Sequence, residues 1–90
     1  MEGVIGSLVK SRAGRDKGRF FVILSIQDEN YVYIADGDLR KIERPKKKKL
    51  KHLDVSKRVL DDFMLKINNN QQNLNSELRK IILCIAIEKK

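Results

Sequence analysis

The first half of the chain alternates apolar and polar positions in short runs, which is the pattern of β-strands joined by turns. Residues 7–10 begin a first strand, and residues 19–26 form the longest β-rich run. Residues 31–35 alternate aromatic and aliphatic side chains, which predicts a third strand. Because alternate residues share a face, we expect Val32 and Ile34 to face the core.

Two segments that contain glycine predict turns between these strands. The polar residues 13–18 include Gly14 and Gly18, and glycine adopts backbone angles that other residues avoid. Asp36 followed by Gly37 is a strong hairpin signal, because glycine accepts a positive φ. We expect a turn at each segment.

The chain after the second turn is expected to form the last strands of a sheet. Residues 39–42 are interpreted as the next strand, and Pro45 breaks regular structure because it has no N–H. Leu50 and Leu53 are expected to hold a last short strand or a docking segment. Residues 1–53 are therefore predicted to form a small β-barrel.

The C-terminal half changes to the three-to-four spacing of an amphipathic helix. Asp54 or Ser56 is a suitable residue to cap the start of a first helix. The polar residues 68–73 then predict a loop. The apolar positions of this first helix are Val55, Val59, Leu60, Phe63, Met64 and Ile67.

A second helix is predicted after the loop, with Asn75 or Ser76 as its N-cap and Glu77 at the positive end of its dipole. Residues 81–87 are also β-branched enough to form a strand, and that alternative stays open. We predict that residues 54–90 form a helical appendage that packs on the barrel. The apolar positions of the second helix are Leu74, Leu78, Ile81, Ile82 and Ile85.

The composition narrows the class of partner. The 90 residues fit one small domain, and 20 Lys and Arg against 12 Asp and Glu leave a net charge of +8. Residues 1–53 hold thirteen basic and seven acidic side chains, so most of the excess lies in the predicted barrel. Such a balance favours a polyanion, and nucleic acid is the leading class.

The sequence also disfavours a disulfide-bonded, a zinc-binding and a membrane-spanning protein. One cysteine, Cys84, and one histidine, His52, cannot form an internal disulfide or a four-ligand zinc site, and no cofactor is expected. No apolar run is long enough to span a membrane, and the N-terminus lacks the layout of a signal peptide. We therefore expect a cytoplasmic protein without a membrane partner.

Two basic segments are candidate binding elements. Residues 14–18 place Arg15 and Lys17 between two glycines, where backbone and side chains can approach a phosphate. Residues 44–51 hold six cations and no acid, which suits contacts to phosphates without sequence preference. The alternatives are an ordinary solvated turn and a mobile charge run. Tyr31 and Tyr33 are expected on the outer face, either stacked on bases or packed under a helix.

No arrangement of residues suggests catalysis. Asp36 and Asp38 flank a glycine in a predicted turn, where aspartate has an ordinary structural role. Gly14 and Gly18 lack the Lys-Ser/Thr ending of a nucleotide-binding loop. We therefore expect neither an enzyme nor a small-molecule substrate.

The string GSLVKSRAGRDKGRFFV, residues 6–22, resembles the KOW motif of ribosomal proteins and transcription elongation factors. With the Asp36–Gly37 turn and the basic segment up to residue 53, the layout is similar to the L14e-type large-subunit ribosomal proteins and their bacterial KOW-domain relatives. The resemblance covers about 50 residues and implies an SH3-like barrel that binds RNA. We therefore predict a mainly β fold with C-terminal α, an SH3-like KOW barrel followed by two short helices.

The function predicted from the sequence is that of an RNA-binding, ribosome-associated module whose RNA is large-subunit ribosomal RNA. The alternative is a protein-interaction adaptor of the elongation-factor KOW or Tudor type, and the oligomeric state is left open. Gly14, Gly18, Asp36 and Gly37 are the expected turn residues. The expected RNA contacts are Lys10, Arg12, Arg15, Lys17, Arg19, Arg40, Lys41, Arg44, Lys46, Lys47, Lys48, Lys49 and Lys51.

Overall fold

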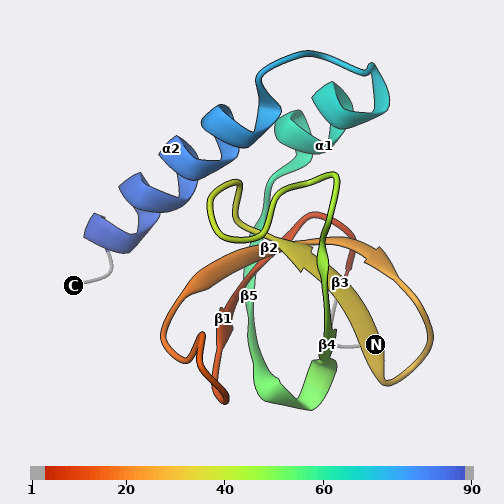
Figure 1. Ribbon diagram of the computed structural model, residues 1–90, viewed down its shortest axis with the longest axis vertical. Coiled ribbons are helices and arrows are strands. Elements are labelled where there is room, and N and C mark those ends of the chain that lie inside the picture. The colour runs from red at the N-terminus through yellow and green to blue at the C-terminus, as the bar shows by residue number, and fades with distance from the viewer. Residues whose placement is uncertain (1–3, 89–90) are drawn as a thin grey trace.

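The computed structural model describes residues 4–88 and consists of one five-stranded antiparallel sheet followed by two helices (Figure 1). The fold is mainly β with C-terminal α, as the sequence predicts. No helix within residues 4–88 has the length and apolar character needed to cross a membrane. The elements in chain order are β1 (Ser7–Ser11), β2 (Phe20–Ile26), β3 (Tyr31–Ala35), β4 (Lys46–Lys49), the 3-10 helix η1 (Leu50–His52), β5 (Leu53–Val59), α1 (Asp61–Asn68) and α2 (Leu74–Glu88).

The sheet has the strand order β4-β3-β2-β1-β5, so β4 and β5 are its two edges. These edge strands are consecutive in the chain and are joined by only the three residues of η1. The sheet must therefore curl until its edges approach each other, and Figure 1 shows this curl. The two edges are not paired by a ladder, so the sheet is open.

The concave face of the sheet encloses the first hydrophobic core. Val32 and Ile34 lie in it, as the alternation in β3 predicts, and Phe21 points inward while Phe20 does not. Each of these strands contributes every second residue to the interior. The buried members of this core are Val9, Phe21, Ile23, Val32, Ile34 and Leu53.

The opposite face of the sheet packs against α1 and α2, which lie together on that side in Figure 1. Val22 and Ala35, which are partners in the β2–β3 ladder, form the floor of this second core. Phe63 from α1 and Leu78 from α2 are buried against them. The helices therefore cover apolar surface that the sheet alone would expose to water.

Residues 39–42 are not a strand, contrary to the sequence prediction, and β4 begins only at Lys46. The Asp36 carboxylate accepts hydrogen bonds from the amides of Asp38 and Arg40, both at 2.9 Å. The amides of Asp36 and Gly37 donate to the carbonyl oxygen of Arg40. These local bonds fold the segment back on itself, so the backbone groups that form them are not available to pair with a neighbouring strand.

The lysine run is the next strand, β4, and is not a mobile charge run. It pairs antiparallel with β3, and Lys46 lies opposite Ile34 while Lys48 lies opposite Val32. Lys48 is buried with 8% of its surface exposed. The alternative of a mobile charge run is therefore wrong for residues 46–49.

The first helix is shorter than predicted. Residues 53–59 form β5, which adds to the free edge of β1, with Val55 opposite Val9. The helix begins at Asp61 after an N-cap at Leu60, so Asp54 and Ser56 are strand residues and not caps. The predicted boundary after residue 53 therefore falls within β5, and the sheet extends to Val59.

The second helix is confirmed, and the strand alternative for residues 81–87 is wrong. The α2 helix begins at Leu74, so Asn75 and Ser76 lie in its first turn and do not precede it. The Asn75 side chain instead accepts a hydrogen bond from the Ile42 amide at 2.8 Å and donates to Glu43 at 2.7 Å. It thereby joins the β3–β4 loop to α2.

Gly37 allows this loop to approach α2 closely. A Cβ atom added at Gly37 would lie 2.2 Å from the carbonyl oxygen of Asn75, whereas one at Gly18 would meet nothing within 4 Å. Both glycines have positive φ, at 78° and 89°. An alanine at either position would therefore have an unfavourable positive φ, but only at Gly37 would its Cβ atom collide with the backbone of α2.

We predict that Gly37→Ala lowers the free energy of unfolding by at least about 2 kcal/mol more than Gly18→Ala, because only the former displaces a helix backbone. Urea denaturation of both variants measures the difference. Equal destabilisation would show that α2 does not rest on this loop.

Candidate nucleic-acid interface

The β1–β2 loop is closed by backbone hydrogen bonds at its base. The Ser11 amide donates to the Arg19 carbonyl oxygen, and the Gly18 amide donates to that of Ser11, both at 2.9 Å. The Arg12 amide donates to the carbonyl oxygen of His52 in η1 at 2.8 Å. These bonds tie the loop both to itself and to the segment between the edge strands.

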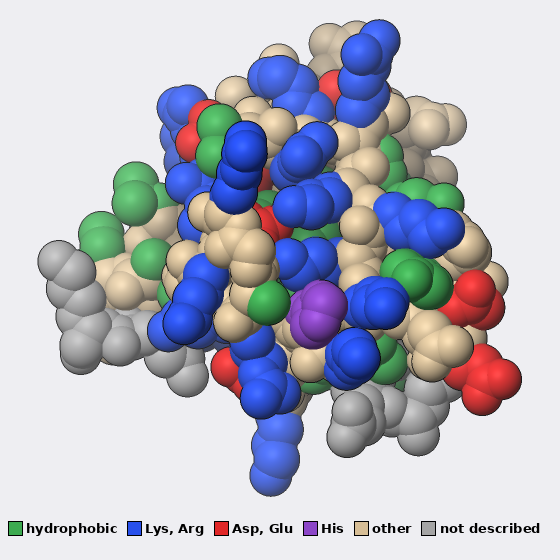
Figure 2. Space-filling model, turned by 60° about the horizontal axis from the view of Figure 1, so that its bottom comes forward, with side chains coloured by type: hydrophobic (Ala, Val, Ile, Leu, Met, Phe, Trp, Pro, Cys, Tyr) green, Lys and Arg blue, Asp and Glu red, His purple; other side chains and the backbone are tan. Residues whose placement is uncertain are grey.

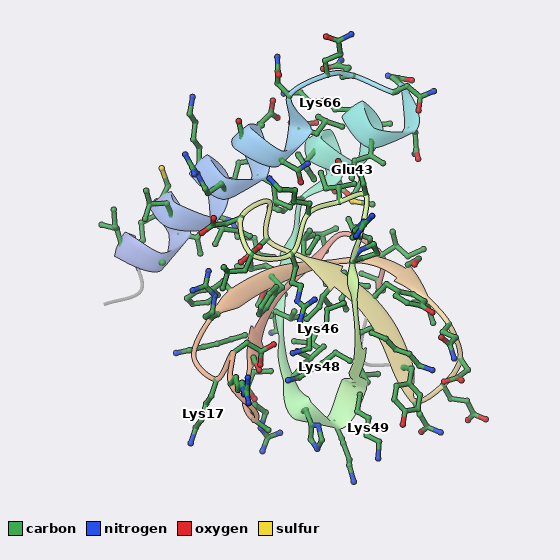
Figure 3. All side chains as sticks on the ribbon, viewed as in Figure 1. Lys17, Glu43, Lys46, Lys48, Lys49 and Lys66 are labelled. Carbon is green, nitrogen blue, oxygen red and sulfur yellow. The ribbon has the colours of Figure 1, made fainter. Side chains whose placement is uncertain are left out.

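Asp16 binds the loop to β4. Its Oδ1 atom accepts hydrogen bonds from Ser11 Oγ at 2.7 Å and from Lys48 Nζ at 2.9 Å. Its Oδ2 atom accepts one from Lys46 Nζ at 2.9 Å. Lys48 Nζ also donates to the Ala13 carbonyl oxygen at 2.8 Å. One carboxylate therefore joins three donors from two strands. Figure 3 labels the two donors that belong to β4, Lys46 and Lys48.

This environment favours the charged form of Asp16. Burial alone raises the pKa of the carboxyl group, but the hydrogen bonds from Lys48 and Ser11, followed by that from Lys46, have the larger opposite effect. The pKa of Asp16 therefore lies well below its ordinary value of 3.8. The carboxylate stays ionised throughout the neutral range.

The four lysines of β4 fall into two pairs because successive side chains point to opposite faces. Lys46 and Lys48 point inward to Asp16. Lys47 and Lys49 point outward, and their Nζ atoms lie 4.7 and 5.9 Å from the centre of the Tyr31 ring. Among residues 4–88, only the inward pair has a carboxylate partner.

The tip of the loop presents its cations to solvent. Arg15 and Lys17 are exposed, and neither forms an ion pair with any residue among 4–88. Figure 2 shows Lys and Arg side chains gathered over the face where the loop, β4 and η1 meet. We call this surface the basic face, and its exposed cations are Arg12, Arg15, Lys17, Lys47, Lys49 and Lys51.

A cleft of about 470 Å³ opens beside the loop tip. Arg15 and Arg19 from the β1–β2 loop line it together with Arg40 from the β3–β4 loop and Lys46 from β4. The exposed side chain of Leu39 stands at its side. Sequence spacing does not reveal this convergence, because the cations come from three segments that meet only in the fold, through the Asp16 contacts with β4 and the Arg19 contact with Asp36.

The other cations predicted to contact RNA are either paired with an acidic side chain or lie outside the cleft at the loop tip. Arg12 is paired with Asp54 at 3.5 Å, and Arg19 with Asp36 at 3.1 Å, so part of their charge is already balanced. Lys10 lines a separate groove beside α2. Lys41 and Arg44 are exposed on the β3–β4 loop and line none of these clefts.

The expected role of Tyr31 and Tyr33 is modified by their surroundings. Tyr31 is half-buried beneath the outward lysines, and Tyr33 donates a hydrogen bond from its hydroxyl to Gln27 at 2.7 Å. Neither belongs to the apolar cluster under the helices. The alternative in which they pack under a helix is therefore wrong.

No protein-family model matches the chain, and a search of curated proteins finds no relative. The KOW resemblance therefore rests on the residues quoted for it. Among residues 4–88, no three His, Cys, Asp or Glu side chains are grouped as ligands of a metal ion.

We predict that Asp16→Asn lowers the free energy of unfolding by about 3 kcal/mol at pH 6, because it leaves the buried Lys48 ammonium without its counter-charge. The folded-state pKa lies below the unfolded one, so this contribution is present above about pH 4 and declines as the pH falls further. Denaturation of both proteins between pH 6 and pH 2.5 measures it.

Asp54→Asn is the matched control, because Asp54 pairs with Arg12 while 64% of its side chain is exposed. It should change stability by no more than about 0.5 kcal/mol at any pH. A difference between Asp16→Asn and the parent protein that does not shrink in acid would contradict the ionic origin of the stabilisation.

Proposed function

We propose that the protein binds structured RNA through the basic face, with phosphates received by Arg15 and Lys17 at the loop tip and by Lys47 and Lys49 on β4. The observation that carries this proposal is the concentration of exposed, unpaired cations on a loop held rigid by Asp16. Fixed cations lose less conformational entropy on binding than mobile ones. The face is thus suited to phosphates at defined positions.

We also propose that the curled sheet is an SH3-like barrel of the KOW type. Two observations support this: β1 to β4 form a meander, and β5 returns to pair with β1. The resemblance of residues 6–22 to the KOW motif falls on β1, the loop and the start of β2, where the phosphate contacts are proposed. Large-subunit ribosomal RNA in the cytoplasm is the ligand that the resemblance implies.

The division between the two lysine pairs changes what each can contribute. Lys46 and Lys48 hold the loop in place, and their charge is balanced by Asp16. The proposed phosphate contacts are therefore fewer than the thirteen cations singled out in the sequence. For each phosphate contact that a substitution removes, the slope of log affinity against log salt should fall by about 0.7 to 0.9.

We predict that Arg15→Gln together with Lys17→Gln weakens RNA binding by about 1 to 3 kcal/mol, because the substitutions remove charged hydrogen bonds to phosphates. Titration with large-subunit ribosomal RNA at several salt concentrations, with transfer RNA as competitor, measures affinity, slope and preference. The preference for ribosomal RNA should fall with the affinity.

Lys57→Gln together with Lys80→Gln provides the control, because it removes the same charge from exposed positions on β5 and α2 outside the basic face. This variant should lose only the small affinity that long-range attraction supplies. If both double variants lose affinity equally, net charge explains the binding and the loop has no special role.

A further inference from the structure

A second surface lies between α2 and the sheet, beside the end of the β1–β2 loop at Gly18 and Arg19. It is a groove of about 530 Å³ between the later turns of α2 and the start of β2. Its apolar lining consists of Phe20, Ile82, Leu83 and Ala86, and Lys10 and Arg79 are among its charged residues. A concave volume of this size is typical of a binding site.

The helix carries more apolar surface than the sheet covers. Its inner stripe packs on the sheet, where Leu78 and Ile85 are fully buried. A second stripe lies on the solvent side of the helix, where Leu83 and Ile87 remain 59% and 63% exposed, and Leu83 also lines the groove. A surface helix normally turns charged residues to solvent, so a second apolar stripe indicates an interaction surface.

The sheet supplies the other wall of the groove. Phe20 lies on the same face of β2 as Val22, but Val22 is fully buried and Phe20 is only half-buried. The Nζ atom of Lys10 lies 5.5 Å from the centre of the Phe20 ring. The groove therefore joins an aromatic ring on the sheet to the second stripe of α2.

The charges on the groove indicate the kind of partner. Arg19 is balanced by Asp36 and Asp38, at 3.1 and 3.7 Å. Lys10 and Arg79 have no acidic partner within ion-pair distance among residues 4–88. The five charged residues of the lining carry a net charge of +1, and the two cations without a carboxylate partner lie beside the apolar floor, which favours an occupant that combines apolar and acidic side chains.

A second copy of this chain fits the groove less well. Each copy carries a net charge of +8, so two copies repel one another. A stable interface also buries about 800 Å² on each side, whereas the second stripe offers only a few side chains. A short acidic helix avoids both difficulties.

We propose that this groove binds an acidic amphipathic helix of another protein. Apolar side chains of that helix, spaced at i, i+3 or i+4, and i+7, enter between Phe20 and the second stripe of α2. Its carboxylates face Lys10 and Arg79. None of the six exposed cations of the basic face lines the groove, but Arg19 lines both the groove and the cleft at the loop tip.

The test uses a library of amphipathic 16-residue peptides whose apolar positions are constant and whose polar positions are each Glu or Lys. Binding to the full-length protein should select peptides rich in Glu. Arg79→Glu and Leu83→Glu should each weaken the selected peptides about tenfold, as expected for central contacts of an interface.

Lys80→Glu is the matched control, since it makes the same charge change on the next residue of α2 without lining the groove. It should retain most of the peptide affinity, and circular dichroism should show that all three variants are folded. Selection of no peptide, selection of Lys-rich peptides, or equal binding by Arg79→Glu and Lys80→Glu would overturn the proposal. So would sedimentation of the parent protein as a dimer that Leu83→Glu dissociates, because a second copy would then fill the groove.

Discussion

The contact on which the rest of the structure depends is the one between the Asp16 carboxylate and the lysines of β4. An ammonium group such as that of Lys48, which is 8% exposed, is costly to bury without a counter-charge. Asp16 supplies that charge from a loop more than thirty residues away in the sequence, and Ser11 and the Ala13 carbonyl oxygen complete the set of hydrogen bonds. A strand made only of lysine is stable in this place because of these partners.

The same contact links the β1–β2 loop to β4, an edge strand of the sheet. Asp16 follows β1, whereas Lys46 and Lys48 belong to β4, which is separated from β1 in the sheet by β2 and β3. Their ion pairs span the concave face and reinforce the curl that the short η1 connection requires. The helices stabilise the other face through Leu78 and Phe63. The basic face is thus fixed by polar contacts within the curl, and the groove by apolar packing outside it.

Much of the sheet is predictable from local pattern, and the exceptions have identifiable causes. The alternation in residues 31–35 predicts β3 correctly, because aromatic and aliphatic residues differ visibly between the two faces. A run of four identical lysines contains no alternation, so the sequence does not reveal which two are buried. Val55 and Val59 fit a helical spacing, but they pair with the free edge of β1 and therefore belong to β5. Residues 39–42 do not form a strand, because the Asp36 carboxylate accepts hydrogen bonds from the amides of Asp38 and Arg40.

The candidate site is also only partly predictable from the sequence. The loop cations are recognisable because glycines flank them, whereas their convergence with Arg40 and the restraining role of Lys46 require the fold.

The most direct test of the proposed interface is the RNA affinity of Asp16→Asn, measured at low temperature where the variant is folded. This change removes a negative charge from the basic face, so simple attraction predicts tighter binding. We predict weaker binding, because the loop is then without the ion pairs that hold Arg15 and Lys17 in place; equal or tighter binding would contradict a positioning role for Asp16.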